Sequence, residues 1–347
     1  MKHTPRKLLK VLSAAFAVAA LSGVATSASA EQQVLYVGMN GGDMERAFTQ
    51  HVFPPFEKAN NVKVVVVPGT SADVLAKAQA FKDNPQMHVM FLDDGVMSRA
   101  VSMGLCEKLK PSAELEELYP SARMKDDMSS AVTMDFTGIA YNPKMFAEQG
   151  WAKPTSWQDF ADPKLKGKVV VQSASSSSFG LHTFLMINRI AGGTEANVDP
   201  AFSSWKDTVG KNVLEYIPNS SKLSEMLQTG EVAMFPLTRG ATIRMQKRDL
   251  PVEFVVPKEG AVLLSVAQCV IAKNSKPELA QALARYLISQ EAQNLVVKHS
   301  GNGAANAKAI VEPEMQAALA EAIVLDWDQI NQKRAEWNVR WNRTIER

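Results

Sequence analysis

The sequence lacks the marks of most enzymes, membrane proteins and nucleic-acid-binding proteins. It contains no G-x-S-x-G, G-x-x-x-x-G-K-[ST], H-E-x-x-H or G-x-G-x-x-G motif, so no common hydrolase, phosphate-loop, metalloprotease or dinucleotide site is indicated. No apolar run after residue 30 is long enough to cross a bilayer. Four of the 38 basic residues lie in the first thirty positions, which leaves 34 against 36 acidic ones. This balance excludes the basic face that nucleic acid requires.

Cysteine and histidine are too few or too scattered to predict a metal site or a cofactor. The two cysteines, Cys106 and Cys269, can pair in an oxidising compartment or lie apart as buried thiols, and their spacing leaves both possibilities open. The histidines lack metal-ligand spacing. Ser175 and His182 would form a dyad with no identifiable orienting carboxylate or oxyanion donor, so a hydrolase is the least favoured alternative.

The chain opens with an export signal. The first thirty residues carry four basic side chains, then an apolar run over residues 8–24, and end in Ala28-Ser29-Ala30. Ser13 and Ser22 interrupt the apolar run, which disfavours a membrane anchor. We therefore expect residues 1–30 to be a cleaved signal peptide and the mature chain to be free in the periplasm of a Gram-negative bacterium. The remaining 317 residues are enough for two domains.

Three apolar segments, residues 34–39, 62–67 and 89–92, read as strands that each end in small or polar residues before a helical pattern. This order is typical of an open α/β sheet, in which ligands bind where the strands end. Asp93 and Asp94 can hold an amine or cap the following helix, and both interpretations stay open. The candidate ligand-binding residues at these three strand ends are Asn40, Gly41, Thr70, Ser71, Asp93 and Asp94.

A second α/β lobe follows. Residues 137–141 end the first lobe as an apolar strand, and a new strand opens near Lys168 after a Pro- and Gly-containing turn. Residues 267–272 read as the strand that returns to the first lobe. We therefore expect lobe I to comprise residues 31–139 and 262–347, lobe II to comprise residues 140–261, and two crossing strands to join them.

Polar residues also gather at the ends of the second lobe's strands. Serines at positions 173–178, at a strand-to-helix transition, favour an anion such as a carboxylate or phosphonate, or else simply cap the helix. Arg239 offers a fork for a carboxylate, or pairs with a nearby acid. Phe136 lines the ligand cleft or packs in the core. The candidates from this lobe and from the crossover are Asp135, Phe136, Ser175, Ser176, Ser177 and Arg239.

Several segments resemble one known family. VGMNGGDMERAF, VVPGTSADVLAKAQA, MFLDDGVMSRA, PTSWQDFADPKLKGKVVV and DWDQINQKRAEWNVRWNR are similar to stretches of the periplasmic binding proteins of ABC importers, in their polyamine and ferric-ion branches. The resemblance implies a type II periplasmic binding protein fold, with two α/β lobes around a ligand cleft. It also implies a monomer that is not an enzyme, binds a solute by hinge closure, and delivers it to a membrane permease and its ATPase.

The resemblance also bears on the ligand. Polyamine binders carry a Trp and an Asp that hold an ammonium group, whereas the matching stretches here, residues 237–240 and 263–267, have neither. The ferric branch uses a tyrosine pair, and none of the five tyrosines are adjacent. We therefore expect a small polar, zwitterionic or carboxylate- or phosphonate-bearing solute, such as an amino-acid derivative. A polyamine is the alternative, and ferric iron is less favoured.

The C-terminal segment places aromatic residues at helical spacing. Trp327, Ile330, Arg334, Trp337 and Trp341 recur at intervals of three or four. Such a stripe usually marks a buried face, so we expect the last helix to pack against the first lobe rather than to form a stacking platform for a ligand.

Overall fold

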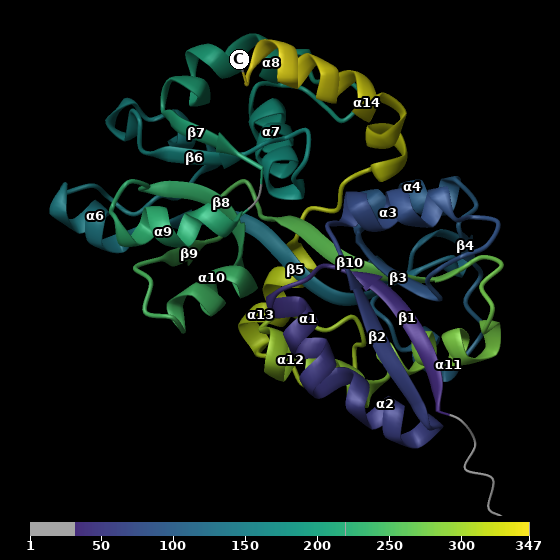
Figure 1. The fold of residues 1–347 in the computed structure, drawn as a ribbon. Coiled ribbons are helices and arrows are strands. Elements are labelled where there is room, and N and C mark those ends of the chain that lie inside the picture. The colour runs from purple at the N-terminus through teal and green to yellow at the C-terminus, as the bar shows by residue number, and fades with distance from the viewer. Residues whose placement is uncertain (1–31, 219, 347) are drawn as a thin grey trace, which may run out of the picture. The chain divides into compact units, whose positions relative to one another are not determined.

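The fold is built around one mixed sheet (Figure 1). The computed structural model describes residues 32–218 and 220–346, so the predicted signal peptide lies outside the described residues. The strands are β1 Gln33–Met39, β2 Val62–Pro68, β3 Val89–Asp93, β4 Cys106–Glu107, β5 Ser130–Tyr141, β6 Val169–Gln172, β7 Val213–Ile217, β8 Met234–Thr238, β9 Glu253–Val255 and β10 Val262–Ile271. Their order is β2-β1-β3-β10-β5-β8-β6-β7, with β4 added beside β10 and β9 beside β5.

Helices flank the sheet along its length. The α-helices are α1 Asp43–Ala47, α2 Phe53–Asn60, α3 Ser71–Ala80, α4 Asp94–Ser102, α5 Ala113–Glu116, α6 Pro143–Glu148, α7 Ser178–Ile190, α8 Asp199–Ser204, α9 Leu223–Gln228, α10 Arg239–Gln246, α11 Pro277–Leu287, α12 Gln290–Ser300, α13 Pro313–Glu321 and α14 Trp327–Thr344. A π-helical segment, η1 Phe48–Val52, joins α1 to α2. Short 3₁₀ segments are η2 Pro120–Ala122, η3 Lys125–Asp127, η4 Trp157–Ala161, η5 Pro163–Leu165, η6 Trp205–Asp207, η7 Val209–Lys211 and η8 Ser220–Lys222.

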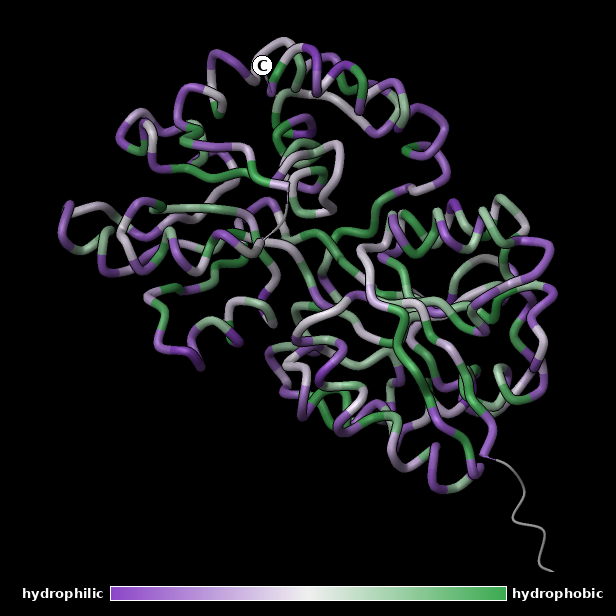
Figure 2. The backbone as a smooth tube through the Cα atoms, viewed as in Figure 1, coloured by the Kyte–Doolittle hydropathy of each residue, from purple (hydrophilic) through white to green (hydrophobic). Residues whose placement is uncertain are grey.

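The first lobe is a sandwich of helices around parallel strands. β1 pairs in parallel with β2 and β3; β3 is buried almost throughout, whereas β2 alternates between buried and exposed residues along its first half. One core joins β1 to η1, α2, α11 and α12, and a second core joins β3 to α3 and α4. A strand buried on both faces must be apolar throughout, which explains the continuous hydrophobic run of β3. Figure 2 shows this concentration of hydrophobic residues in the strands.

The second lobe repeats this arrangement, and two long strands connect the lobes. β6 pairs in parallel with β7 and β8, with α7 and α8 in one core and α9 and α10 in another. β5 pairs with β10 through its first half and with β8 and β9 through its second half. The predicted two-lobed α/β fold with two crossing strands is therefore confirmed. The residue limits of the lobes stay a prediction.

The last helix packs differently from the prediction. Trp341 lies in the second lobe's core, with ring centroids 5.5 Å from Phe184, 5.1 Å from Trp205 and 5.7 Å from Tyr216. Figure 1 shows α14 beside α8 of the same lobe. The expected packing against the first lobe is confirmed only for the start of α14, where Asn331 donates to the Gly95 carbonyl at 3.1 Å. The rest of the helix packs on the second lobe, because the aromatic spacing identifies a buried face but not its partner.

Local contacts show how the two cysteines are paired and how two of the helices begin. Cys106 and Cys269 form a disulfide, with Cα atoms 5.6 Å apart, that joins β4 to β10. The capping box between Thr70 and Asp73 is also present at the start of α3. By contrast, α11 begins after Lys276 without a side-chain cap and has a proline in its first turn.

Candidate functional site

A cavity of about 600 Å³ lies where strands of both lobes end, and we call it the main cavity. Residues after β1, β2 and β3 line it from the first lobe, and residues after β6 and β8 line it from the second. β5 and β10 contribute Thr133, Asp135, Leu264 and Val266. Strand ends of both lobes therefore meet around one space, as open α/β sheets arrange their ligand sites. The predicted residues that line it are Asn40, Gly41, Thr70, Ser71, Asp93, Asp135, Ser176 and Ser177.

On the first lobe, hydrogen bonds fix the loops that border the cavity. The Thr70 hydroxyl accepts from the Asp73 N–H at 3.2 Å, and the Asp73 carboxylate accepts from the Thr70 N–H at 3.0 Å. The Ser71 hydroxyl accepts from the Asp93 N–H at 3.1 Å, which ties the end of β3 to the start of α3. The loop after β2 and the end of β3 are therefore held together at the cavity wall, although β1 lies between these strands in the sheet.

Asp93 connects the two lobes across the cavity. The Ser178 hydroxyl, in the first turn of α7, donates to Asp93 Oδ2 at 2.7 Å. Burial raises the pKa of Asp93 above its ordinary value, and hydrogen bonds from Ser178 and Ser71 oppose this shift. A carboxyl group that is poorly hydrated and faces the cavity can accept a hydrogen bond from an amine of a ligand.

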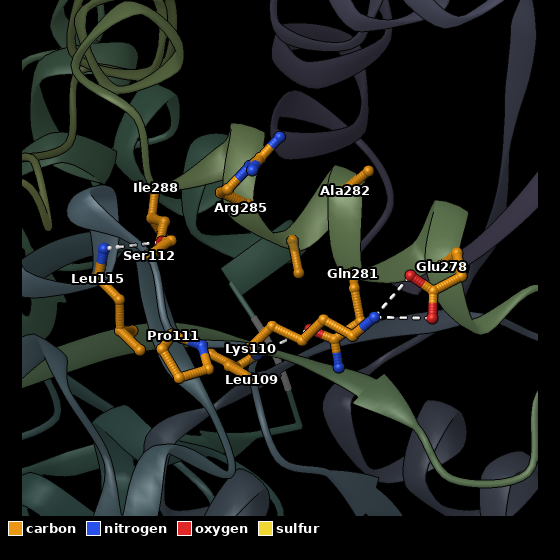
Figure 3. A pocket seen from close by; sticks show the side chains of 11 residues that line it. Leu109, Lys110, Pro111, Ser112, Leu115, Glu278, Gln281, Ala282, Arg285 and Ile288 are labelled. Atoms are coloured by element: carbon orange, nitrogen blue, oxygen red, sulfur yellow. Dashed lines mark hydrogen bonds and ion pairs between the residues drawn. The ribbon is translucent and has the colours of Figure 1, made fainter.

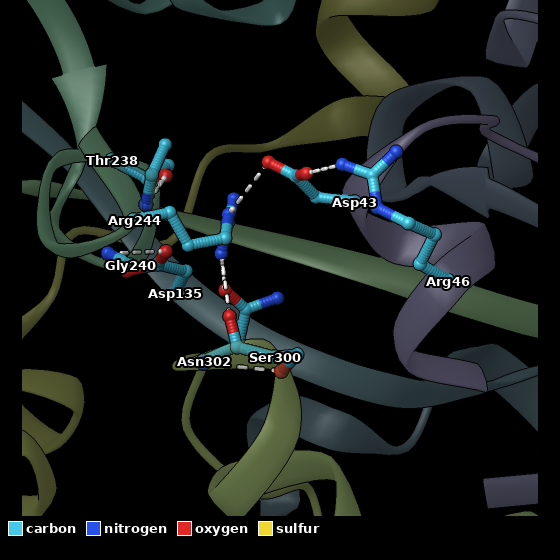
Figure 4. A network of polar contacts seen from close by, with 9 residues as sticks. Asp43, Arg46, Asp135, Thr238, Gly240, Arg244, Ser300 and Asn302 are labelled. Carbon is cyan, nitrogen blue, oxygen red and sulfur yellow. Dashed lines mark hydrogen bonds and ion pairs between the residues drawn. The ribbon is translucent and has the colours of Figure 1, made fainter. Parts of the chain in front are cut away.

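Arg244 also lines the cavity and is the centre of a second polar network (Figure 4). Its Nη1 donates to the Ser300 carbonyl at 2.6 Å and to Asn302 Oδ1 at 3.2 Å. Its Nε lies 3.6 Å from Asp43 Oδ2, and the other oxygen of Asp43 pairs with Arg46. Burial lowers the pKa of Arg244, while nearby carboxylates oppose that shift. The guanidinium is thus oriented by fixed acceptors and remains a cation at the cavity wall.

Asp135 lies beside this network on β5. It accepts hydrogen bonds from the N–H groups of Phe136 at 2.9 Å and Gly240 at 3.0 Å. Burial raises the pKa of Asp135 to about 6. A Cβ atom at Gly240 would lie 2.7 Å from Asp135 Oδ2 and 2.5 Å from Asn302 Oδ1. Only glycine therefore lets the start of α10 approach this carboxyl group.

The serine cluster both caps a helix and lines the cavity. The Ser177 hydroxyl accepts from the Phe179 N–H at 3.2 Å and donates to Gln172 Oε1 at 2.7 Å. A Cβ atom at Gly180 would lie 1.9 Å from the Gln172 carbonyl oxygen, so the first turn of α7 rests directly on the end of β6. The capping interpretation of the cluster is therefore correct, and Ser176, Ser177 and Ser178 also face the cavity.

Four predicted site residues lie outside the main cavity: Asp94, Phe136, Ser175 and Arg239. Asp94 and Phe136 follow Asp93 and Asp135 directly, and adjacent residues at a strand or its end point to opposite faces. Phe136 is fully buried, and its ring centroid lies 5.7 Å from that of Phe254, so the alternative that it packs in the core is correct. The Ser175 hydroxyl lies 2.8 Å from the Ser173 hydroxyl. Arg239 donates to the Glu312 carboxylate at 3.1 Å, so the alternative that it pairs with a nearby acid is correct.

Sequence reasoning missed the helix face that contributes the basic side chains. Ala241, Arg244 and Met245 line the main cavity at the spacing i, i+3, i+4 of one helix face, and Arg248 lines it from the turn after α10. Arg239 falls outside this spacing, which explains why it points elsewhere. The same periodicity, read from the sequence, would have selected Arg244. Other polar lining residues that were missed are Arg46, Thr133, Gln172, Ser220, Ser224, Thr238 and Asn302.

A smaller hollow of about 260 Å³ lies between residues 109–112 and α11 (Figure 3). Its polar groups bind one another: Lys110 Nζ lies 2.7 Å from Glu278 Oε1, and the Lys110 N–H donates to Gln281 Oε1 at 3.1 Å. The main cavity, with polar groups from both lobes, is the stronger candidate for a ligand site. Within residues 32–218 and 220–346, no cluster of three His, Cys, Asp or Glu side chains suits a metal, and no helix is long and apolar enough to span a membrane.

Comparison with known proteins agrees with this geometry. The sequence model of the family of bacterial extracellular solute-binding proteins matches residues 52–322. A putative 2-aminoethylphosphonate-binding periplasmic protein of Salmonella paratyphi A is 22% identical over 301 residues, which cover 85% of this chain and 83% of the relative. The spermidine/putrescine-binding periplasmic protein 1 of Haemophilus influenzae is 24% identical over 305 residues, which cover 82% of this chain and 81% of that relative.

Among solved structures, the periplasmic binding protein AfuA of Actinobacillus pleuropneumoniae, with fructose-6-phosphate bound, superposes with a TM-score of 0.76. It is 22% identical, and the match covers 91% of this chain and 99% of AfuA. At this level of identity the likeness establishes the type II periplasmic binding protein fold alone. The binding role of the individual cavity residues stays a prediction.

Proposed function

Since this chain belongs to the family of bacterial extracellular solute-binding proteins, we propose that it is the periplasmic solute-binding component of an ABC importer. It is exported by its signal peptide, binds a small polar solute as a monomer, and delivers it to a membrane permease and the ATPase attached to that permease. It acts by binding, without chemical change to the solute, and needs no cofactor.

The proposed solute is zwitterionic, with a carboxylate or phosphonate at one end and an ammonium group at the other. The observation that carries this proposal is the mixture of charges around one cavity. Guanidinium groups can bind the acid in a forked geometry, and carboxyl groups can accept from the ammonium. The charged lining residues are Arg46, Arg244, Arg248, Asp43, Asp93 and Asp135.

The two charged ends of the solute have different partners. Arg244 on α10 and Arg248 in the turn after α10 both line the cavity, and the N–H groups at the start of α7 add the positive end of a helix dipole. We assign the acid group to this second-lobe side. Asp93 at the end of β3, and Asp135 on the crossing strand, are assigned to the ammonium group.

A polyamine is the second candidate, favoured by the same carboxyl groups and by one relative's name. A solute with only positive charges would lie close to the arginines of the cavity, and that repulsion costs affinity. The name of the Salmonella relative offers a direct probe, because 2-aminoethylphosphonate carries both charges.

Binding is coupled to closure of the lobes. A solute that touches strand ends of both lobes stabilises the arrangement in which those ends are close together, and it therefore shifts the population toward the closed state. The two crossing strands, β5 and β10, are the segments that must absorb the rotation.

Thermal unfolding of the purified mature chain tests the solute class. We expect 2-aminoethylphosphonate or an α-amino acid to raise the melting temperature, since a ligand at 100 times its Kd stabilises by about 2.7 kcal/mol. Putrescine and spermidine are the matched cations without an acid group. Stabilisation by these polyamines alone would overturn the zwitterion proposal. Mass spectrometry of the recovered ligand should return it unchanged, and a modified product would contradict a pure binding role.

A further inference from the structure

A second cavity, of about 530 Å³, lies on the other face of β10. Leu263, Ser265 and Ala267 line it, whereas Leu264 and Val266 line the main cavity. Because successive side chains of a strand point to opposite faces, the sheet itself separates the two cavities. The second cavity is therefore not an extension of the proposed solute site.

Two walls of the second cavity contain buried hydroxyl groups with no partner. Ser129 and Ser265 both line it, with exposed fractions of 0% and 4%. Neither Oγ atom has a hydrogen-bond partner among the described residues. Buried polar groups in folded proteins are nearly always hydrogen-bonded, because an unpaired one costs free energy. Two such hydroxyls at one cavity suggest that a bound molecule supplies the missing partner.

The charge of the lining favours a cation. The cavity is lined by four carboxyl groups, those of Asp94, Asp126, Asp326 and Asp328, and by one guanidinium, that of Arg123. Arg123 is already engaged, at 2.9 Å from both Glu116 and Asp127. Asp94 is buried at the base, where it accepts from the N–H groups of Gly95 and Ser265. Burial, together with the charge of Asp93, raises the pKa of Asp94 to about 7.

The lining also has aliphatic side chains and an aromatic ring beside Asp94. Leu263, Val324 and Leu325 provide aliphatic walls. The indole of Trp327 packs so close to Gly95 that a Cβ atom there would lie 2.5 Å from the ring. The Trp327 side chain also hydrogen-bonds to Asp94, so the indole lies directly beside the carboxyl group and adds apolar surface there.

From these features we propose that the second cavity binds a small organic ammonium ion with an apolar body. The ammonium group donates to Asp94 and to the hydroxyls of Ser129 and Ser265, and the apolar body lies against Trp327 and Leu325. The proposal does not depend on the identity of the solute in the main cavity.

Benzylammonium is a suitable probe, and isothermal titration calorimetry on the mature chain is the measurement. We expect one site per chain. Ser98 lines the cavity on α4, so Ser98→Trp should fill it and weaken binding at least tenfold. Asp94→Asn should also weaken binding at least tenfold, because it removes the negative charge. Met103→Trp is the matched control: Met103 follows α4, is 43% exposed and lines neither cavity, so the affinity should stay within twofold.

Benzyl alcohol, which has the same ring without the charge, should bind at least tenfold more weakly than benzylammonium. Equal affinities would overturn the ammonium assignment. Absence of any heat of binding, or binding retained by Ser98→Trp at the wild-type affinity, would overturn the site itself. Each variant is first shown to unfold cooperatively, and Ser102→Trp, on the exposed end of the same wall, replaces Ser98→Trp if that variant does not fold.

Discussion

Replacing Arg244 with glutamine is expected to weaken binding of the zwitterionic solute about 30- to 140-fold. The side chain of Arg244 is 29% exposed, and acceptors at Ser300 and Asn302 hold its guanidinium in place. Loss of one member of a desolvated charged contact costs about 2–5 kcal/mol. Because Arg244 keeps some contact with water, we take about 2–3 kcal/mol, and each 1.4 kcal/mol is a factor of ten in Kd.

The same substitution also removes hydrogen bonds that support the fold. The Ser300 carbonyl and the Asn302 side chain lose a donor, and Asp135 loses a nearby cation. We expect the free energy of unfolding to fall by about 1–3 kcal/mol. Urea unfolding without ligand measures this loss, so that it can be separated from the change in affinity.

Isothermal titration calorimetry with the zwitterion that gives the largest thermal shift is the assay. Arg239→Gln is the matched control, since it removes the same group five residues earlier on α10 from a side chain that binds Glu312 and does not line the main cavity. We expect this control to change Kd less than twofold. If Arg244→Gln binds as tightly as the wild type, or if Arg239→Gln is weakened equally, the assignment of the acid group to this face of α10 is wrong.

Three further predictions concern stability and closure. Burial raises the pKa of Asp135 from 3.8 to about 6, so between these pH values the native state holds a proton that the unfolded state has lost. Between pH 4 and pH 7, the free energy of unfolding of the wild type should therefore fall by up to about 3 kcal/mol more than that of Asp135→Asn. Urea unfolding at both pH values measures this, and an equal fall in the two proteins would contradict it. The disulfide between Cys106 and Cys269 joins residues 163 positions apart, so its reduction should lower the free energy of unfolding by about 3–5 kcal/mol. If dithiothreitol leaves the urea midpoint unchanged, this prediction is wrong. Saturating solute should lower the radius of gyration in small-angle scattering, whereas identical curves would argue against hinge closure.

Buried strands were the part of the fold most accessible from sequence. The runs at residues 34–39, 62–67 and 89–92 correspond to β1, β2 and β3, and the continuous apolar run of β3 reflects burial on both faces. β7 was missed because its residues are mostly half-buried or exposed, and β4 because it has only two residues. Strand length was also underestimated: β10 begins at Val262, five residues before the predicted start.

The partner of an element is harder to predict than its buried face. The aromatic stripe of α14 correctly indicated burial, yet Trp337 and Trp341 lie in the second lobe's core. Likewise, the polar residues at the strand ends were recognised, but Asp94 and Phe136 were grouped with their neighbours Asp93 and Asp135. Adjacent side chains point to opposite faces, which separates the members of each pair. Which member faces the cavity depends on how the strand pairs with β10.

The same alternation makes β10 the common wall of both cavities. Leu264 and Val266 face the main cavity and Ser265 faces the second, so neighbouring residues of one strand contact different spaces. β10 is also one of the two strands that cross between the lobes, and the N–H of Ser265 donates to Asp94 at 3.3 Å. A cation held by Asp94 would therefore be tied to a strand that must adjust when the lobes rotate. Any difference in its affinity between the open and closed arrangements would, by linkage, appear as an equal change in solute affinity at the main cavity.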